Sequence, residues 1–215
     1  MTDRSISDIP QSTIERLPQY LRCLLELQAL GVPLVKSDRL AGLCGSNAAQ
    51  VRKDFSYLGE LGTRGIGYEV SALIDHISKI LGVKERRRVA IVGYGKLGAA
   101  LHGYSGFPER GFEVVALFDV DPAKVGREFD GVRLYHLDEA PRVLKELGVE
   151  IAIVATPARA AQLAADAIVE GGVKAILNLA PTRLVVPDDV NVRQVCLSTD
   201  LQILSFFLAK QEGAE

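Results

Sequence analysis

Three glycines that follow an apolar run are the residues of this chain with the clearest chemistry. The run Val89–Val92 ends in Gly93-Tyr-Gly-Lys-Leu-Gly98, and a G-x-G-x-x-G turn after a strand allows a pyrophosphate to approach the backbone closely. The helix predicted over 97–104 would point its free N–H groups and positive dipole end at the same place. The motif therefore predicts a dinucleotide phosphate site. Its expected contacts are Gly93, Tyr94, Gly95, Lys96, Leu97 and Gly98; a glycine-rich turn that binds nothing is the alternative.

A carboxylate follows at the distance from the glycines where such a site holds a ribose. Asp119 ends a second predicted strand, 114–119, and lies 21 residues beyond Gly98. A carboxylate in this place accepts hydrogen bonds from the adenosine ribose, and because no arginine follows it directly, we expect NAD(H) rather than NADP(H). Asp121 and Lys124, in the next loop, are lesser predicted contacts.

Strands and helices alternate through the rest of this half, which predicts a Rossmann-like α/β domain with a parallel sheet. The segments 132–136, 149–155, 173–180 and 190–196 read as strands, and 140–147 and 158–170 as helices. Ligands collect at the carboxyl ends of parallel strands. We therefore expect Ala155, Thr156 and Pro157 along the nicotinamide half of the cofactor, with Asn178 at the same edge.

The residues that could use a dinucleotide in catalysis are not apparent. None of the three histidines, His76, His102 and His136, follows a central strand beside a carboxylate, as a hydride-transfer enzyme would require. Cys23, Cys44 and Cys196 lie far apart without a C-x-x-C pair, so we expect buried free thiols and no metal site. No catalytic residue is predicted.

The first part of the chain predicts a helix-turn-helix. A helical pattern over 11–30, with a start complicated by Pro18, precedes two short helices at 37–44 and 47–57 that are joined at Gly45. The second short helix gathers apolar residues on one face and polar residues on the other, as a recognition helix does in the major groove. Its expected DNA contacts are Ser46, the predicted N-cap, and Gln50, Arg52, Lys53 and Tyr57. An ordinary solvated helix face is the alternative.

A glycine-rich segment after this helix predicts a hairpin. Residues 59–67 contain four glycines around Thr63 and Arg64, which suits two strands with a flexible tip. A helix-turn-helix followed by a hairpin is a winged helix, and Thr63 and Arg64 would then contact the neighbouring backbone or minor groove. A helix over 72–81, capped by Ser71, closes this domain.

The last segment predicts a helix that must be covered by another chain. Residues 200–211, capped by Ser198 or Thr199, leave almost no polar face, and a helix that is apolar nearly all round is buried on several sides. We expect it to pack into a partner subunit of a two-fold dimer. That would bring Phe206 or Phe207 near a nicotinamide; plain dimer packing is the equal alternative.

Composition sets the remaining limits. The 215 residues are 48% hydrophobic and 24% charged with a net charge of −2, typical of a soluble globular protein and without a global sign of nucleic-acid binding. No membrane span or signal peptide is apparent, so we expect a cytoplasmic protein. The expected domains are 1–84, the winged helix; 85–198, the dinucleotide domain; and 199–215, the dimerisation helix.

These motifs together resemble the Rex family of bacterial redox-sensing transcriptional repressors. The resemblance rests on five segments spread over nearly the whole chain: 16–20, 51–59, 62–68, 93–98 and 178–181. It implies a homodimer with swapped C-terminal helices that binds inverted-repeat operator DNA and is released when NADH rises relative to NAD+. It also implies a switch in which Arg16 pairs with an acidic residue near the nucleotide domain, matched here to Asp188, with Tyr104 as a third member.

Two other classes of protein stay open at this point. One is an NAD-dependent oxidoreductase with an accessory helical domain, and the other is a CoA-binding domain, which shares the glycine turn and the parallel sheet.

Overall fold

The computed structural model describes residues 8–59, 61–63 and 65–212. The chain divides into two compact units, Met1–Glu85 and Arg86–Glu215, which are described separately below. Their division falls one residue beyond the boundary expected from the sequence.

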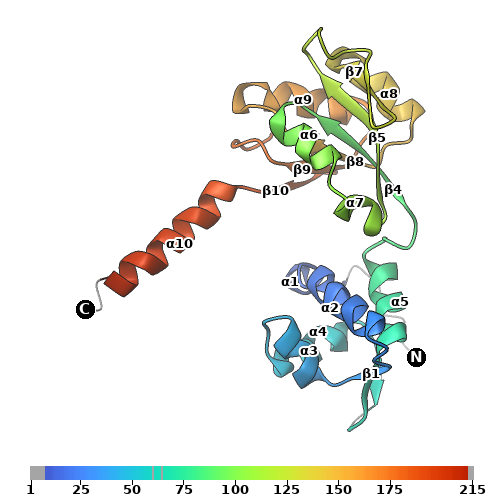
Figure 1. The fold of residues 1–215 in the computed structure, drawn as a ribbon, viewed down its shortest axis with the longest axis vertical. Helices are drawn as coiled ribbons and strands as arrows, with labels where there is room; N and C mark the ends of the chain where they lie inside the picture. The colour runs from blue at the N-terminus through green and yellow to red at the C-terminus, as the bar shows by residue number, and fades with distance from the viewer. Residues whose placement is uncertain (1–7, 60, 64, 213–215) are drawn as a thin grey trace. The chain divides into compact units, whose positions relative to one another are not determined.

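The first unit is a helical domain with a small sheet (Figure 1). The predicted helix over 11–30 is in fact two, α1 (Gln11–Ile14) and α2 (Leu17–Ala29), because Pro18 is accommodated in the first turn of the second. The turn leaves Arg16 between the two helices. The helix-turn-helix follows as α3 (Ser37–Leu43) and α4 (Ala48–Tyr57).

The N-caps of these helices differ from those predicted. Asn47 caps α4, because its side chain accepts a hydrogen bond from the Gln50 N–H at 2.8 Å, and Ser46 stands outside the helix. The last helix of the unit, α5 (Val70–Ile80), begins one residue before Ser71, which was predicted to cap it.

A three-stranded sheet completes a winged helix. The predicted hairpin is present as β2 (Gly62–Thr63) and β3 (Gly67–Glu69), which pair antiparallel, and β1 (Leu34–Val35) pairs with the other edge of β3. Strand β1 was not predicted, because two residues carry no periodicity. Gly67 is required where it stands: its φ is +116°, and a Cβ would lie 2.6 Å from the Val35 oxygen.

The second unit is a Rossmann-like domain built on a seven-stranded sheet in the order β10-β9-β8-β4-β5-β7-β6. All pairs are parallel except β6 with β7. The strands are β4 (Arg87–Val92), β5 (Phe112–Asp119), β6 (Glu128–Phe129), β7 (Val132–His136), β8 (Ile151–Val154), β9 (Ala175–Asn178) and β10 (Asn191–Gln194). The short antiparallel β6 was not predicted.

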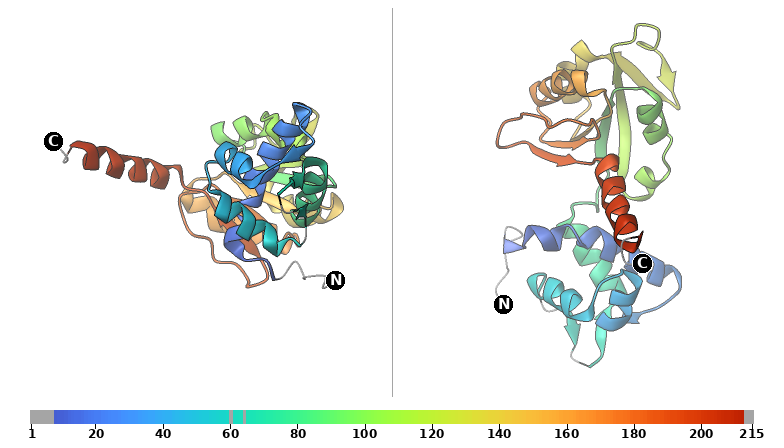
Figure 2. Two further views of the ribbon diagram at one scale, coloured as in Figure 1. Left: turned by 90° about the horizontal axis from the view of Figure 1, so that it is seen from below. Right: turned by 90° about the vertical axis from the view of Figure 1, so that its left-hand side faces the viewer.

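Helices cover both faces of this sheet, as the right-hand view of Figure 2 shows. On one face α6 (Lys96–His102) and α7 (Gly106–Glu109) cover Val89 and Ile91 of β4. On the other, the short helix η2 (Leu137–Glu139), α8 (Ala140–Glu146) and α9 (Ala158–Glu170) cover Ala90 and Val92. Burial of β4 on both faces explains why its sequence is a continuous apolar run.

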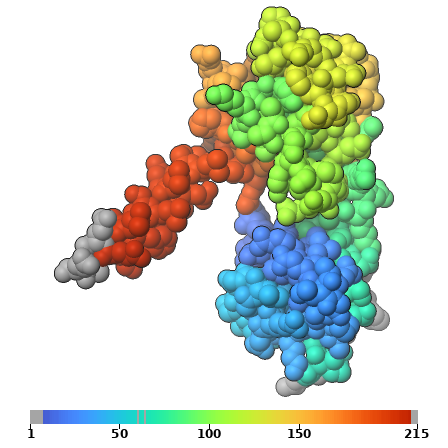
Figure 3. Space-filling model, viewed as in Figure 1, coloured from blue at the N-terminus to red at the C-terminus, as the bar shows by residue number. Residues whose placement is uncertain are grey.

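The last helix, α10 (Leu197–Glu212), extends three residues further toward the N-terminus than predicted. Its side chains from Leu197 to Gln211 are all exposed, and Phe206 and Phe207 keep 64% and 53% of their surface accessible. Figure 3 shows these side chains, in red, uncovered in that view. Among the described residues, no helix is both long and apolar enough to cross a membrane.

Two of the three cysteines are buried as expected, but Cys196, just before α10, is only half-buried.

Candidate functional site

The glycine turn follows β4, the strand at which the order of strands along the sheet changes direction. Strand β4 is flanked by β5 and β8, which follow it in the chain on opposite sides, so the crevice beyond its carboxyl end is the topological switch point. Ligands of open parallel sheets bind in this crevice. The structure brings the turn, Asp119 and Ala155 together there.

Glycine suits each of the three positions of the turn for a different structural reason. Gly93 has a φ of +96°, and a Cβ would lie 2.7 Å from the Ala155 oxygen. A Cβ on Gly98 would lie 2.0 Å from the Gly93 oxygen, so only glycine lets α6 pack on the turn. Gly95 has no heavy atom within 4 Å of its Cβ position. That open space, at the N-terminus of α6, is what a phosphate needs.

Asp119 holds the turn as well as facing the site. Its Oδ2 accepts a hydrogen bond from the Tyr94 N–H at 2.8 Å, and its Oδ1 accepts from the N–H groups of Val120 at 2.8 Å and Asp121 at 3.0 Å. Lys124 Nζ lies 3.5 Å from Oδ2 and donates to the Tyr94 oxygen at 3.2 Å. Burial raises the pKa of Asp119, but these N–H donors and the Lys124 charge outweigh burial and leave it below its ordinary value. Asp119 is therefore an anion at this edge.

An unsatisfied polar atom marks the other side of the crevice. The Thr156 Oγ1 is buried and is the one such side-chain atom among the described residues that lacks a hydrogen-bond partner. Its Cγ2 lies 2.8 Å from where a Cβ of Gly93 would stand. Because buried hydroxyls nearly always have a partner, this oxygen fits a polar group of a bound ligand. Lys96, Leu97 and Pro157 are exposed around the same edge, and Asp121 contacts Lys124 at 3.4 Å.

Two predicted cofactor contacts are engaged elsewhere. The Tyr94 side chain is buried and contacts the Phe129 ring at a tilt of 46°, with ring centroids 4.6 Å apart. Its hydroxyl lies 3.1 Å from His102 Nδ1. Asn178 is fully buried, and both protons of its side-chain amide are used within the fold. It donates to Thr182 O and Gln194 Oε1 and accepts from Ala180 N–H, at 2.7, 2.6 and 3.0 Å. Both side chains are engaged within the fold, and their contact with a cofactor stays a prediction.

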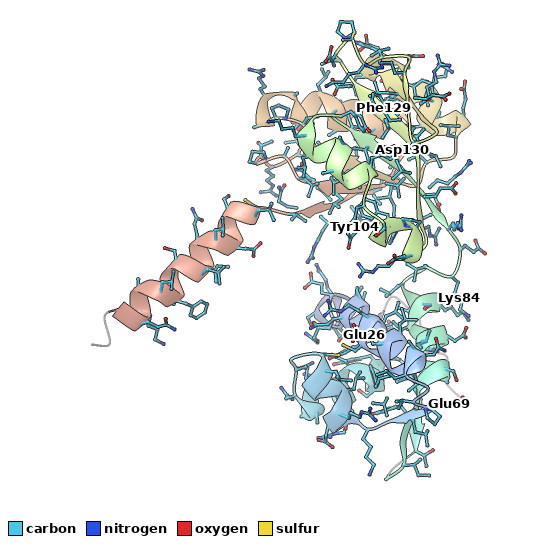
Figure 4. The ribbon with its side chains drawn as sticks, viewed as in Figure 1. Glu26, Glu69, Lys84, Tyr104, Phe129 and Asp130 are labelled. Carbon is cyan, nitrogen blue, oxygen red and sulfur yellow. The ribbon has the colours of Figure 1, made fainter. Side chains whose placement is uncertain are left out.

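Arg16 pairs with a carboxylate of its own unit in this structure, and the pairing that the resemblance implies for one state of the switch stays a prediction. It binds Asp54 of α4 through two hydrogen bonds, Nε to Oδ2 at 2.7 Å and Nη2 to Oδ1 at 2.6 Å. Asp188 is exposed in the loop between β9 and β10 of the other unit. Tyr104, labelled in Figure 4, is half-exposed and lies against Gly106, where a Cβ would stand 2.4 Å from its ring.

Asp54 is a residue of this region that the sequence analysis did not single out. It is fully buried in the winged helix, yet it accepts hydrogen bonds from Thr13 Oγ1, Tyr20 Oη and Gln50 Nε2 at 2.9, 2.7 and 2.9 Å in addition to those from Arg16. Burial raises its pKa, but these donors together lower it below the ordinary 3.8. The available signal was a charged residue on the apolar face of a recognition helix, between Val51 and Leu58.

The predicted DNA-contacting residues lie on or next to α4 and on the hairpin, and they differ in how exposed they are and in whether they have a hydrogen-bond partner. Lys53 and Thr63 are exposed, Tyr57 packs partly on the core, and Ser46 interacts with the Tyr20 hydroxyl. Arg52 is exposed but donates to Ser37 Oγ at 3.0 Å. Arg64 lies outside the described residues.

A groove of about 640 Å³ separates α4 from the hairpin. Its lining includes the polar residues Lys36, Ser37, Asp38, Arg52, Ser56, Thr63 and Tyr68. Two cations and four hydroxyl groups, against the single carboxylate of Asp38, could bind the phosphates of a nucleic acid.

Comparison with known proteins decides the family. Residues 8–56 match the family model described as "Putative DNA-binding protein N-terminus", and residues 84–182 match the one described as "CoA binding domain". The redox-sensing transcriptional repressor Rex of Streptomyces avermitilis is 51% identical over 96% of this chain and 82% of its own length. The chain belongs to the Rex family. The Rex of Carboxydothermus hydrogenoformans is 47% identical over 92% of the chain and 95% of its own length.

Solved structures of this family have the same fold. The structure of RSP in complex with beta-NAD+ and operator DNA matches with a TM-score of 0.89, at 34% identity, and covers 95% of this chain and 94% of that one. RSP in complex with beta-NADH matches with a TM-score of 0.85 at 33% identity, covering 95% and 96%. The family members are redox-sensing repressors, so the predicted class of protein is confirmed.

Gly98→Ala should destabilise the second unit by roughly 1–3 kcal/mol, because the new Cβ meets a backbone oxygen that cannot move aside. Gly103→Ala is the matched control, since its Cβ would be 3.9 Å from the nearest atom, an ordinary contact, and should change stability by less than about 1 kcal/mol. Urea unfolding followed by circular dichroism measures both. Equal stabilities of the two variants would contradict the packing role of Gly98.

Asp54→Asn should lower the unfolding free energy of the first unit by roughly 3 kcal/mol at neutral pH, because it breaks a buried ion pair. The pKa of Asp54 is lower in the folded than in the unfolded state. The ionised carboxylate therefore adds to the free energy of unfolding above pH 3.8, and this stabilisation is lost as the pH falls through the pKa of the folded state. The difference between wild type and variant should therefore shrink below pH 3.8. Asp38→Asn, at an exposed position of α3, should show no comparable difference in unfolding experiments at either pH.

Proposed function

We propose that this chain is a cytoplasmic NADH sensor that uses its winged helix to bind operator DNA and its Rossmann-like unit to bind NAD(H). The observation that carries the proposal is the glycine turn, packed between Ala155 and α6 with open space at Gly95. It stands in the same chain as a helix-turn-helix with a hairpin. RSP, which shares this fold over 95% of the chain, was solved with beta-NAD+ and operator DNA and with beta-NADH.

The nucleotide is held by the carboxyl edge of the sheet. Gly95 and the first turn of α6, with Lys96 and Leu97, receive the pyrophosphate, and the Asp119 carboxylate accepts from the adenosine ribose beside Lys124. Ala155, Thr156 and Pro157 border the nicotinamide half, where the Thr156 hydroxyl gains the partner that it lacks. Backbone and hydroxyl groups in these places bind and orient the cofactor.

Charge explains how one site distinguishes two oxidation states. Oxidised nicotinamide carries a positive charge and the reduced ring is neutral. A pocket lined by apolar side chains penalises the charged ring by the cost of taking it out of water. Phe206 of the partner subunit's α10 provides that lining in our proposal, so NADH binds more tightly than NAD+.

The elements that bind DNA in this proposal are α4 and the hairpin. Gln50 reaches base edges from the first turn of α4, and Lys53 contacts a phosphate. Thr63 and Arg64 contact the DNA backbone beside the major groove. Arg52, tied to Ser37, belongs to the phosphate-facing groove. Two such helices in a two-fold dimer match an inverted repeat only when their separation suits successive major grooves.

The dimer forms through α10, and its geometry links the two ligands. The exposed apolar side chains of α10 need a partner, and a second copy provides one by symmetry. If NADH favours a dimer in which the recognition helices no longer match the repeat, DNA and NADH weaken each other's binding. Exchange of Arg16 between Asp54 and an acidic group such as Asp188, with Tyr104, is the proposed switch between the two dimer geometries.

The oxidoreductase alternative lacks support, because the relatives with whole-chain similarity are repressors. The match to the CoA-binding model covers only the sheet domain with its glycine turn. CoA therefore serves as a control ligand in the experiment below.

The function is tested by DNA binding of the full-length protein to a duplex selected from a random library, titrated separately with NADH, NAD+ and CoA. NADH should release the duplex, and NAD+ and CoA should not. Equal DNA affinity with and without saturating NADH would contradict the proposal.

Lys53→Ala should weaken this DNA binding roughly tenfold and reduce the slope of log affinity against log salt by about 1. NADH binding, followed by fluorescence, should not change. Lys79→Ala, at an exposed position of α5, is the matched control and should bind DNA like wild type.

Leu204→Asp should convert the dimer into monomers, because a charge on the apolar surface of α10 cannot be buried in an interface without a partner. Gln202→Asp adds the same charge at an exposed polar position of the same helix and should retain the dimer. Sedimentation velocity measures both. A Leu204→Asp protein that remains dimeric at micromolar concentration would place the interface elsewhere.

A further inference from the structure

We propose that Asp54 is a positioning residue for base reading: it fixes the side-chain amide of Gln50 so that Gln50 recognises the adenine of an A·T pair in the operator. This inference rests on the proposed DNA-binding function and names the base that one side chain of that site reads.

The argument begins with the protonation state of Asp54. The carboxylate is fully buried and receives five hydrogen bonds, two of them from the Arg16 guanidinium. Arg16, which keeps 31% of its side chain exposed, supplies the opposite charge. A buried carboxylate with a paired cation and several donors is ionised, and an ionised carboxylate only accepts hydrogen bonds.

This state determines which way the Gln50 amide points. The two ends of a glutamine amide are nearly alike in shape, and the partner decides between them. Because Asp54 Oδ1 can only accept, the group 2.9 Å from it must be the Gln50 NH2. The Gln50 Oε1 and its second N–H are then left for another partner.

The backbone of Gln50 is fixed as well. Its N–H donates to the Asn47 side chain at 2.8 Å, which caps α4 and makes Gln50 the third residue of the helix. Side chains in the first turn of a recognition helix are those that reach base edges. Gln50 is half-buried, so part of its side chain stays accessible to a base. Because its backbone and amide are both held by hydrogen bonds, the amide is oriented before a base binds.

An outward carbonyl oxygen beside one N–H is complementary to a single base in the major groove. Adenine presents an N6–H donor next to the N7 acceptor, which one glutamine amide satisfies with two hydrogen bonds. Guanine presents two acceptors, O6 and N7, and would leave the Gln50 oxygen facing another oxygen. Without the hydrogen bond to Asp54 the amide is free to turn, and the distinction between adenine and guanine weakens.

The test compares the base preferences of full-length variants selected on a random duplex library in the presence of NAD+. Wild type should require A·T at one position of each half-site. Gln50→Met, which keeps the length but removes the amide, and Asp54→Asn should each reduce that preference about tenfold, at the same position and at no other.

Thr13→Val is the matched control, because it removes another donor to the same Asp54 oxygen but does not touch Gln50. It should keep the A·T preference even where it lowers overall affinity. If Asp54→Asn weakens all sequences equally, Asp54 only stabilises the fold, and if Gln50→Met keeps the preference, Gln50 reads no base. Either result overturns the inference while DNA binding itself stands. A wild-type protein that enriches no sequence would instead overturn the proposed function.

A measurement on the wild-type protein covers the case in which Asp54→Asn fails to fold. In nuclear magnetic resonance spectra of the free protein, one proton of the Gln50 NH2 group should be shifted downfield and protected from exchange with solvent, because it is bonded to Asp54. Two protons that exchange equally fast would overturn the inference.

Discussion

The winged helix depends on one buried charge. Asp54 lies on α4, and its hydrogen-bond donors come from α1, from the turn before α2, from α2 and from α4 itself. A carboxylate out of water is tolerated only when such donors are all in place. The orientation of α4 within the domain therefore depends on the positions of Thr13, Arg16 and Tyr20. A change at Arg16 therefore alters the hydrogen bonds of α4, the helix that we propose to bind DNA.

The Rossmann-like unit uses the same device for a different ligand. Asp119 ends a buried strand and binds three backbone N–H groups and Lys124, and the first of these N–H groups belongs to the glycine turn. In each unit a carboxylate that accepts several hydrogen bonds fixes the segment that we propose to contact a ligand. Packing alone leaves a short turn or helix end several equivalent arrangements, whereas a charged acceptor with fixed donors selects one.

Local patterns in the sequence were enough to predict the elements but not the partners of their side chains. The glycine spacing, the hairpin glycines and the apolar runs predicted the glycine turn, the hairpin and the longer strands, because each depends on neighbouring residues, whereas the two-residue strands β1 and β6 were not predicted. The engagement of Asn178 with Gln194, and the burial of Tyr94 against Phe129, depend on residues 16 and 35 positions away. These contacts within the fold could not be predicted from a local pattern. Asp54 escaped attention for the same reason, since its donors lie up to 41 positions away.

Helix α10 shows why the single chain is not the functional unit in our proposal. Helices of its length are marginal in water without tertiary contacts, and its hydrophobic side chains are at least half exposed. Burial of one Leu or Phe side chain contributes about 1.5–3 kcal/mol, so pairing with a second copy stabilises the helix and joins the subunits in the same step. A ligand that touches α10 then acts on helix order and subunit geometry together. In our proposal, that coupling allows the difference between a neutral and a charged nicotinamide ring, which is confined to a few atoms, to change the separation of two recognition helices.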